Sequence, residues 1–110
     1  MPTITDPKAK IEFLLRENKM VFLKEYTFAP PRRFRFDWCV AHNGIMVGIE
    51  YDGGNFGYGR HNRPLGYSKD CEKFNLATVL GFRVLHYTAD MIRKDAHQVI
   101  RDIQGIINGQ

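Results

Sequence analysis

Residues 33–52 read RFRFDWCVAHNGIMVGIEYD, and this stretch decides the fold of the chain. Two segments of alternating polarity flank Asn43-Gly44, the dipeptide that most strongly indicates a two-residue β-hairpin turn. With these two residues as the turn, the numbers of paired residues sum to 87, which places Asp37 opposite Glu50. The other predicted pairs include His42 with Ile45, Trp38 with Ile49 and Arg35 with Asp52.

The alternation predicts one apolar and one polar face for this hairpin. A slip of one residue would mix the two faces, so the pattern supports the register independently of the turn. The expected apolar face comprises Phe34, Phe36, Trp38, Val40, Ile45, Val47 and Ile49. The expected polar face comprises Arg33, Arg35, Asp37, Cys39, Met46, Gly48, Glu50 and Asp52.

Asp37 and Glu50 are the first candidates for catalytic and metal-binding residues. Directly opposed side chains have Cβ atoms about 4.5–5.5 Å apart, and two like charges at this spacing destabilise a sheet. A cation between the carboxylates removes the repulsion, and Mg²⁺ is commonly held by one or two carboxylates together with waters and substrate phosphates. The alternative is a pair of ordinary strand acids neutralised by Arg33 and Arg35 on the same face.

Size, charge and cysteine content restrict the class of protein. The 110 residues, 44% of them hydrophobic, are typical of a single globular domain spanning residues 1–110. The formal net charge of +4 weakly favours a polyanionic partner. Because the sequence contains neither a bilayer-spanning apolar run nor a signal-peptide pattern, we expect a cytoplasmic protein without a membrane partner. Cys39 and Cys71 lack the C-x-x-C spacing and are expected to be buried or half-buried free thiols.

The remaining pattern predicts the element order αβββαβα. Helices are expected over residues 7–18, from a capping Ser68 to residue 80, and over residues 89–107, with further strands over residues 21–28 and 82–87. Gly81 is the expected stop of the second helix. The expected buried helix positions are Cys71, Phe74, Ala77 and Leu80, followed by Ile92, Ala96, Val99, Ile103 and Ile107.

A glycine-rich segment follows the hairpin and holds half of the ten glycines in the chain. Long loops in small domains are frequently functional. Its aromatic side chains are suited to stacking on bases and its arginines to contacting phosphates, although a plain flexible connection is the alternative. The expected DNA-binding residues are Arg33, Arg35, Phe56, Tyr58, Arg60, Arg63 and Lys69.

Five short motifs, in this order, resemble the PD-(D/E)XK (restriction-endonuclease-like) nuclease superfamily, and within it a compact phage and bacterial branch similar to very short patch repair endonucleases. The motifs are Arg35-Phe36-Asp37-Trp38, Ile49-Glu50-Tyr51-Asp52-Gly53-Gly54, Gly59-Arg60-His61, Asp70-Cys71-Glu72-Lys73-Phe74-Asn75 and Gly81-Phe82-Arg83-Val84-Leu85. The resemblance implies an α/β restriction-endonuclease-like core with a four-stranded mixed sheet flanked by helices. It also implies Mg²⁺-dependent hydrolysis of DNA phosphodiester bonds, with Mn²⁺ as a substitute, on substrates such as junctions, mismatches or nicks.

The resemblance assigns Asp37 and Glu50 as metal ligands and adds the backbone carbonyl of Tyr51. The superfamily lysine, two residues after the glutamate, is replaced here by Asp52, which either extends the metal site or pairs with Arg35. Lys73 is the first candidate for the missing cation. Its alternative is a solvated helix lysine paired with Asp70 or Glu72, and His61 is a second candidate, as a general base or a phosphate contact.

Two further questions remain open at the level of sequence. Glu12 either reaches the metal through water or forms an ordinary helix-surface pair with Arg16, and the second alternative is favoured. A homodimer is compatible with the small size of the chain, but no interface is evident. The competing functions are a non-catalytic nucleic-acid-binding module, favoured by the lysine missing after Glu50, and a protein-interaction domain that uses the aromatic loop.

Overall fold

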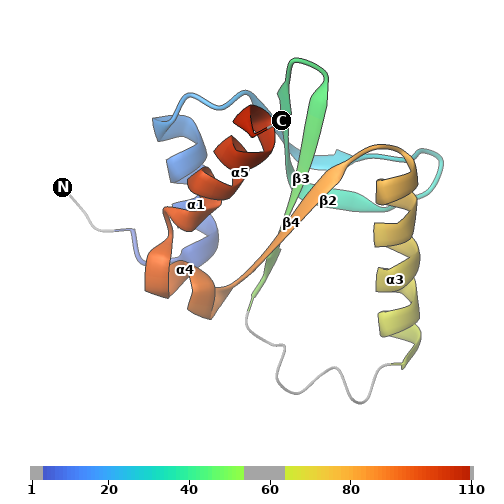
Figure 1. The fold of residues 1–110 in the computed structure, drawn as a ribbon. Helices are drawn as coiled ribbons and strands as arrows, with labels where there is room; N and C mark the ends of the chain where they lie inside the picture. The colour runs from blue at the N-terminus through green and yellow to red at the C-terminus, as the bar shows by residue number, and fades with distance from the viewer. Residues whose placement is uncertain (1–3, 54–63, 110) are drawn as a thin grey trace.

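A four-stranded mixed sheet forms the centre of the molecule (Figure 1). The structure is a computed structural model that describes residues 4–53 and 64–109. Its strands are β1 (Phe22–Thr27), β2 (Arg35–His42), β3 (Ile45–Asp52) and β4 (Arg83–Thr88), and they lie in that order. The β1–β2 and β2–β3 pairs are antiparallel and the β3–β4 pair is parallel. The predicted α/β class, with a four-stranded mixed sheet flanked by helices, is confirmed.

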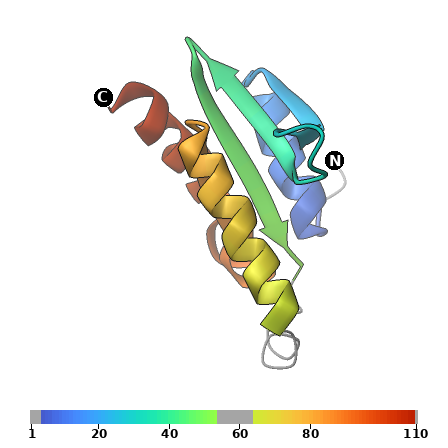
Figure 2. The same ribbon diagram turned by 90° about the vertical axis from the view of Figure 1, so that its right-hand side faces the viewer.

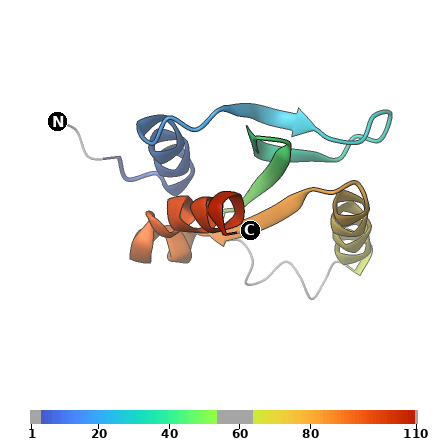
Figure 3. The ribbon, with the colours of Figure 1, turned by 45° about the horizontal axis from the view of Figure 1, so that its top comes forward.

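Helices cover both faces of the sheet. α1 (Pro7–Glu17), α4 (Ala89–Asp95) and α5 (Gln98–Asn108) lie on one face, and α3 (Pro64–Val79) lies on the other (Figures 1 and 3). Figure 2 shows α3 in front of the long strand β3. None of the helices among the described residues is long and apolar enough to cross a bilayer.

Two apolar clusters correspond to the two faces. The larger lies between the sheet and α1, α4 and α5, and the smaller lies beside the C-terminal half of α3. The larger is formed by Ile11, Leu14, Leu15, Trp38, Val40, Val47, Ile49, Tyr87, Ile92, Ala96, Val99, Ile100 and Ile103. The smaller is formed by Phe28, Phe36 and Ala77, with Phe34, Phe82 and Val84 packed against it.

The hairpin turn forms at the predicted residues. Asn43 has φ +48° and Gly44 has φ +84°, and two consecutive positive φ values are required by the type I′ turn that matches strand twist. The predicted register is confirmed at the five paired positions from His42–Ile45 to Trp38–Ile49. The ladder ends there, one pair before Asp37 and Glu50.

The predicted single apolar face of β2 is wrong on the N-terminal side of Trp38. Trp38 packs in the larger cluster, whereas Phe36 packs in the smaller one on the opposite face, with its ring 4.3 Å from that of Phe28. The strand changes face at Asp37, where pairing with β3 ceases, and Glu25, at the corresponding position of β1, has φ +50°. An irregularity across both strands therefore separates two residues that simple alternation places together.

The helix boundaries agree with the sequence in part. α1 begins as predicted, with the Asp6 carboxylate accepting a hydrogen bond from the Ala9 N–H at 3.0 Å. α3 begins at Pro64 instead of after Ser68, because proline is well suited to the first helical turn. The predicted stop is confirmed at Gly81, which has φ +93° and donates its N–H to the Thr78 carbonyl.

The last predicted helix is two helices, α4 and α5. The Ile100 N–H bonds to the His97 carbonyl three residues earlier, so the chain tightens between the two helices. Ala96 and His97 keep helical backbone angles, which is why hydrophobic spacing does not reveal the break. The expected core positions Ile92, Ala96, Val99 and Ile103 are buried, and Ile107 is half-buried.

The burial predicted for the α3 segment is wrong at two of its four positions. Ala77 is buried and Phe74 is half-buried, but Cys71 is exposed and Leu80 is 50% exposed. α3 lies against the sheet mainly through β4, so one side of its C-terminal half supplies most of the contact. Cys39 is buried as predicted, and both cysteines are free.

Candidate active site

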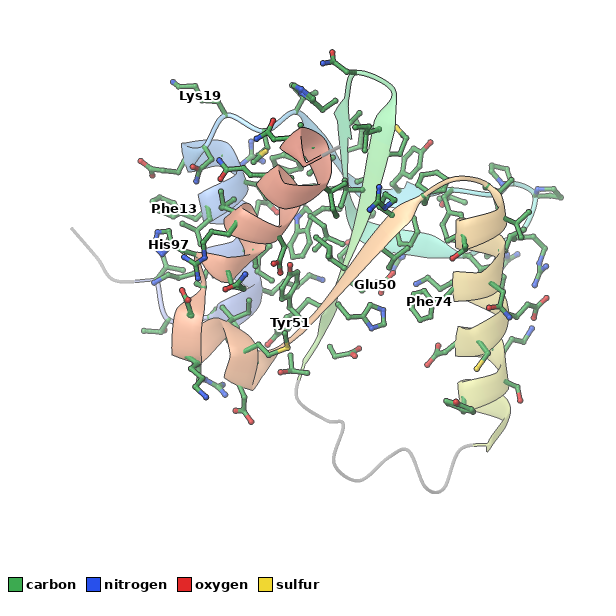
Figure 4. All side chains as sticks on the ribbon, in the orientation of Figure 1. Phe13, Lys19, Glu50, Tyr51, Phe74 and His97 are labelled. Atoms are coloured by element: carbon green, nitrogen blue, oxygen red, sulfur yellow. The ribbon has the colours of Figure 1, made fainter. Side chains whose placement is uncertain are left out.

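Glu50 and Lys73 form an ion pair between the sheet and α3. The Lys73 Nζ atom lies 2.5 Å from Glu50 Oε2, and only 15% of either side chain is exposed. Figure 4 shows Glu50 pointing into the space between the sheet and α3, where Phe74 also lies. The alternative, a solvated Lys73 paired with Asp70 or Glu72, is wrong, since Lys73 is largely buried and binds Glu50, while Glu72 binds Arg32 at 2.6 Å. Lys73 therefore places a cation directly beside Glu50.

The pKa of Glu50 is raised above its ordinary value, mainly because the carboxyl group is largely withdrawn from water. The negative charges of Asp37 and Asp52 raise it further, while the hydrogen bond and charge of Lys73 lower it. Burial therefore outweighs the lysine, and Asp37 and Asp52 add to the effect of burial.

Asp37 lies where β2 changes face, and its carboxylate is held by the neighbouring strand. Its Oδ2 atom accepts a hydrogen bond from the Tyr51 backbone N–H at 2.8 Å, and its Oδ1 atom lies 3.5 Å from Lys8 Nζ. The predicted direct opposition to Glu50 is replaced by a contact to the next residue of β3. Asp37 and Glu50 are still brought to the same end of the β2–β3 pair.

His86 joins this site, although none of the five motifs contains it. The parallel register of β3 and β4 pairs His86 with Glu50, and the His86 ring meets the Phe74 ring edge to face at 4.4 Å between centroids. His86 is an exposed residue of β4, but partial withdrawal of its ring from water lowers its pKa. The charge of Lys73 adds to this, against the opposing charges of Asp52, Asp70 and Asp37. The neutral imidazole is therefore favoured, and it can accept a proton.

The remaining predicted site residues are dispersed. Arg35 binds Glu25 at 3.1 Å, so the alternative Arg35–Asp52 pair is wrong, and Asp52 is exposed at the end of β3. Arg33 and Lys69 are exposed. The predictions for the glycine-rich segment lie outside the described residues, namely those for Phe56, Tyr58, Arg60, His61 and Arg63.

Glu12 stands apart from the two candidate metal ligands. Its carboxylate binds Arg16 at 2.9 Å, as predicted, and also Lys24 at 3.3 Å. It further accepts a hydrogen bond from the indole N–H of Trp38 at 3.2 Å. These bonds lower its pKa against the effect of burial. Glu12 therefore fixes the position of the buried Trp38, immediately after Asp37 in the chain.

The donor set suits a magnesium ion that uses few protein ligands. In residues 4–53 and 64–109, no three His, Cys, Asp or Glu side chains converge on a common metal position. Mg²⁺ does not need such a cage, because it retains several waters and is held by one or two carboxylates plus substrate phosphates. Asp37 and Glu50, at the same end of the β2–β3 pair, are the two carboxylates that would serve as such ligands.

Comparison with known proteins finds similarity in fold but not in sequence family. No protein-family model matches the chain, and no curated protein matches it significantly in sequence. Among solved structures, the catalytic domain of the homing endonuclease I-Bth0305I superposes with a TM-score of 0.66, 20% sequence identity and coverage of 93% of each chain. The chain therefore has the fold of an endonuclease catalytic domain.

Proposed function

We propose that this protein is a divalent-metal-dependent DNA endonuclease that hydrolyses phosphodiester bonds. The observation that carries the proposal is the gathering of Glu50, Lys73 and His86 on the α3 side of a nuclease-type sheet, with Asp37 at the same end of the hairpin. The fold match to a homing endonuclease catalytic domain supports DNA as the substrate. The motif order quoted above favours the PD-(D/E)XK superfamily.

Asp37 and Glu50 would hold Mg²⁺ or Mn²⁺, with the Tyr51 carbonyl and Asp52 as further oxygen donors. A bound divalent ion polarises the phosphate and lowers the pKa of an attacking water. Lys73 holds the Glu50 carboxylate in place and contributes positive charge beside the phosphate. His86 lies beside Glu50 on the same face of the sheet. Its imidazole, kept neutral by the lowered pKa, accepts the proton of the attacking water.

Cleavage assays with four DNA substrates test the proposal. Four-way junction, mismatched duplex, single-stranded and plain duplex DNA are incubated with Mg²⁺, with Mn²⁺ or with EDTA. We expect cleavage of at least one substrate with either metal and none with EDTA. A preference for the junction or the mismatch would identify a structure-specific enzyme, whereas cleavage that persists in EDTA would contradict metal dependence.

The second candidate is a non-catalytic DNA-binding module with a nuclease fold. It is favoured by one observation, the engagement of Glu50 by Lys73 at 2.5 Å, because a lysine already neutralises one candidate metal ligand. Such a module would bind DNA with an affinity that falls with salt, is indifferent to Mg²⁺ and is accompanied by no products.

A further inference from the structure

Each of the two candidate metal ligands is engaged by a lysine, and the two lysines come from opposite faces of the sheet. Lys73 of α3 binds Glu50, and Lys8 of α1 lies 3.5 Å from Asp37. Lys8 was not among the residues that the sequence selected. Its position raises the question of what a second lysine does at this end of the hairpin.

The two contacts differ in tightness. The Lys73–Glu50 pair is short and 15% exposed on both sides, whereas Lys8 is 48% exposed and lies 3.5 Å from Asp37, at the outer limit of a hydrogen bond. The Asp37 carboxylate also has a shorter bond to the Tyr51 N–H, so it does not depend on Lys8 for its orientation. Exposed ion pairs contribute little to stability, and Lys8 can therefore leave Asp37 at small cost.

The other cations near Trp38 have a different partner. Arg16 and Lys24 both bind Glu12, at 2.9 Å and 3.3 Å. The Lys8 Nζ atom lies over the Trp38 ring, 5.9 Å from its centre. Among the described cations on the α1 side, Lys8 is the one that reaches a candidate metal ligand.

We propose that Lys8 is a substrate-binding residue that exchanges Asp37 for a phosphate of the DNA backbone. This inference rests on the proposed function, because it takes DNA to bind where Asp37 lies. A lysine ammonium is attracted to a phosphate. Because the contact of Lys8 with Asp37 is weak and exposed, Lys8 can bind a phosphate instead. Lys8 and Lys73 then hold the DNA from the α1 side and the α3 side of the sheet.

The salt dependence of DNA binding tests this role. Affinity for a duplex is measured by fluorescence anisotropy in EDTA, so that the DNA stays intact, between 50 and 200 mM KCl. One phosphate contact contributes about 0.9 to the slope of log affinity against log salt, or about a 3.5-fold loss over this fourfold range. We expect Lys8→Met to reduce the slope by about 1 and Lys8→Arg to preserve it.

Lys10→Met is the matched control, because it removes the same charge from the same helix. Lys10 is directed elsewhere, beside Arg93 and Ile92 of α4. We expect its slope to equal that of the wild type. If Lys8→Met and Lys10→Met have the same slope while the wild type cleaves DNA, the role of Lys8 is wrong and the proposed function stands. If the wild type neither binds nor cleaves DNA, both are wrong.

Discussion

Lys73 lies against Glu50, with 2.5 Å between Nζ and Oε2, although the two residues are 23 positions apart in the chain. β3 positions the acid and α3 positions the base, so the pair depends on the packing of α3 beside β4. Lys73 lowers the pKa of Glu50 against a stronger effect of burial. The protonation of Glu50 is therefore coupled to a residue on another element.

Lys73→Met should shift the pH dependence of cleavage. Without the ammonium the pKa of Glu50 rises further, so the carboxylate becomes protonated at a higher pH. The acid limb of the profile of rate against pH therefore moves to higher pH. The rate should therefore fall most at the acid end of the range, where Glu50 becomes protonated. The measurement is the cleavage rate from pH 5 to 8. Lys69→Met, one helical turn away and exposed, is the control, and an identical limb in both variants would exclude the coupling.

Gly48→Ala should destabilise the fold. A Cβ atom at this position would lie 2.5 Å from the Phe36 ring, which is fully buried and has no room to retreat. We expect a decrease of about 1–3 kcal/mol in the free energy of unfolding, measured by urea denaturation. Gly105→Ala on α5 is the control, because its Cβ meets nothing within 4 Å and alanine favours a helix. Equal stability of Gly48→Ala and the wild type would contradict the packing of Phe36 against β3.

His86 should make stability depend on pH. Its pKa is lowered in the folded state from the ordinary value of 6.5, so below that pH the unfolded chain binds a proton that the folded chain resists. The wild type should therefore lose stability relative to His86→Gln as the pH falls through 6.5. The two proteins are compared by urea denaturation from pH 8 to 5, with pH 8 as the reference. A constant difference over this range would show that the environment of His86 does not oppose its charge.

The two cysteines should react at different rates with iodoacetamide. Cys71 is exposed, whereas Cys39 is buried and its pKa is raised to about 11 by loss of solvent. The thiolate is the reactive form, so we expect one adduct, on Cys71, in native protein at pH 8. Mass spectrometry of native and urea-unfolded samples provides the measurement. Rapid modification of Cys39 in the native protein would mean that the sheet opens at β2.

The sequence predicted the hairpin because its information is local. Asn43-Gly44 and the alternation beside it specify turn, strands and register within twenty residues. The face change at Asp37 could not be predicted, since it depends on the end of pairing with β3 and on Glu25 in another strand. The division between α4 and α5 was equally hidden, because the chain stays helical through it.

The candidate site was predictable only where its residues share a hairpin or a motif. Asp37, Glu50 and Lys73 belong to the motifs quoted above, and the structure brings Lys73 to Glu50. His86 was missed because its place beside Glu50 follows from a parallel pairing of two residues that are 36 positions apart in the chain. The one signal that pointed to it was the strand predicted over residues 82–87, but neither its neighbour nor its register can be counted from a turn.

The cleavage rates of Asp37→Asn and Glu50→Gln with saturating Mg²⁺ test the central claim, that these two carboxylates support phosphodiester hydrolysis. Both substitutions preserve side-chain shape, and the asparagine oxygen can still accept the Tyr51 N–H. Asp90→Asn, 82% exposed on α4, is the control for the loss of one acid. We predict a loss of about a hundredfold or more for each site variant and none for the control, with circular dichroism unchanged. Wild-type cleavage by either site variant would contradict the assignment.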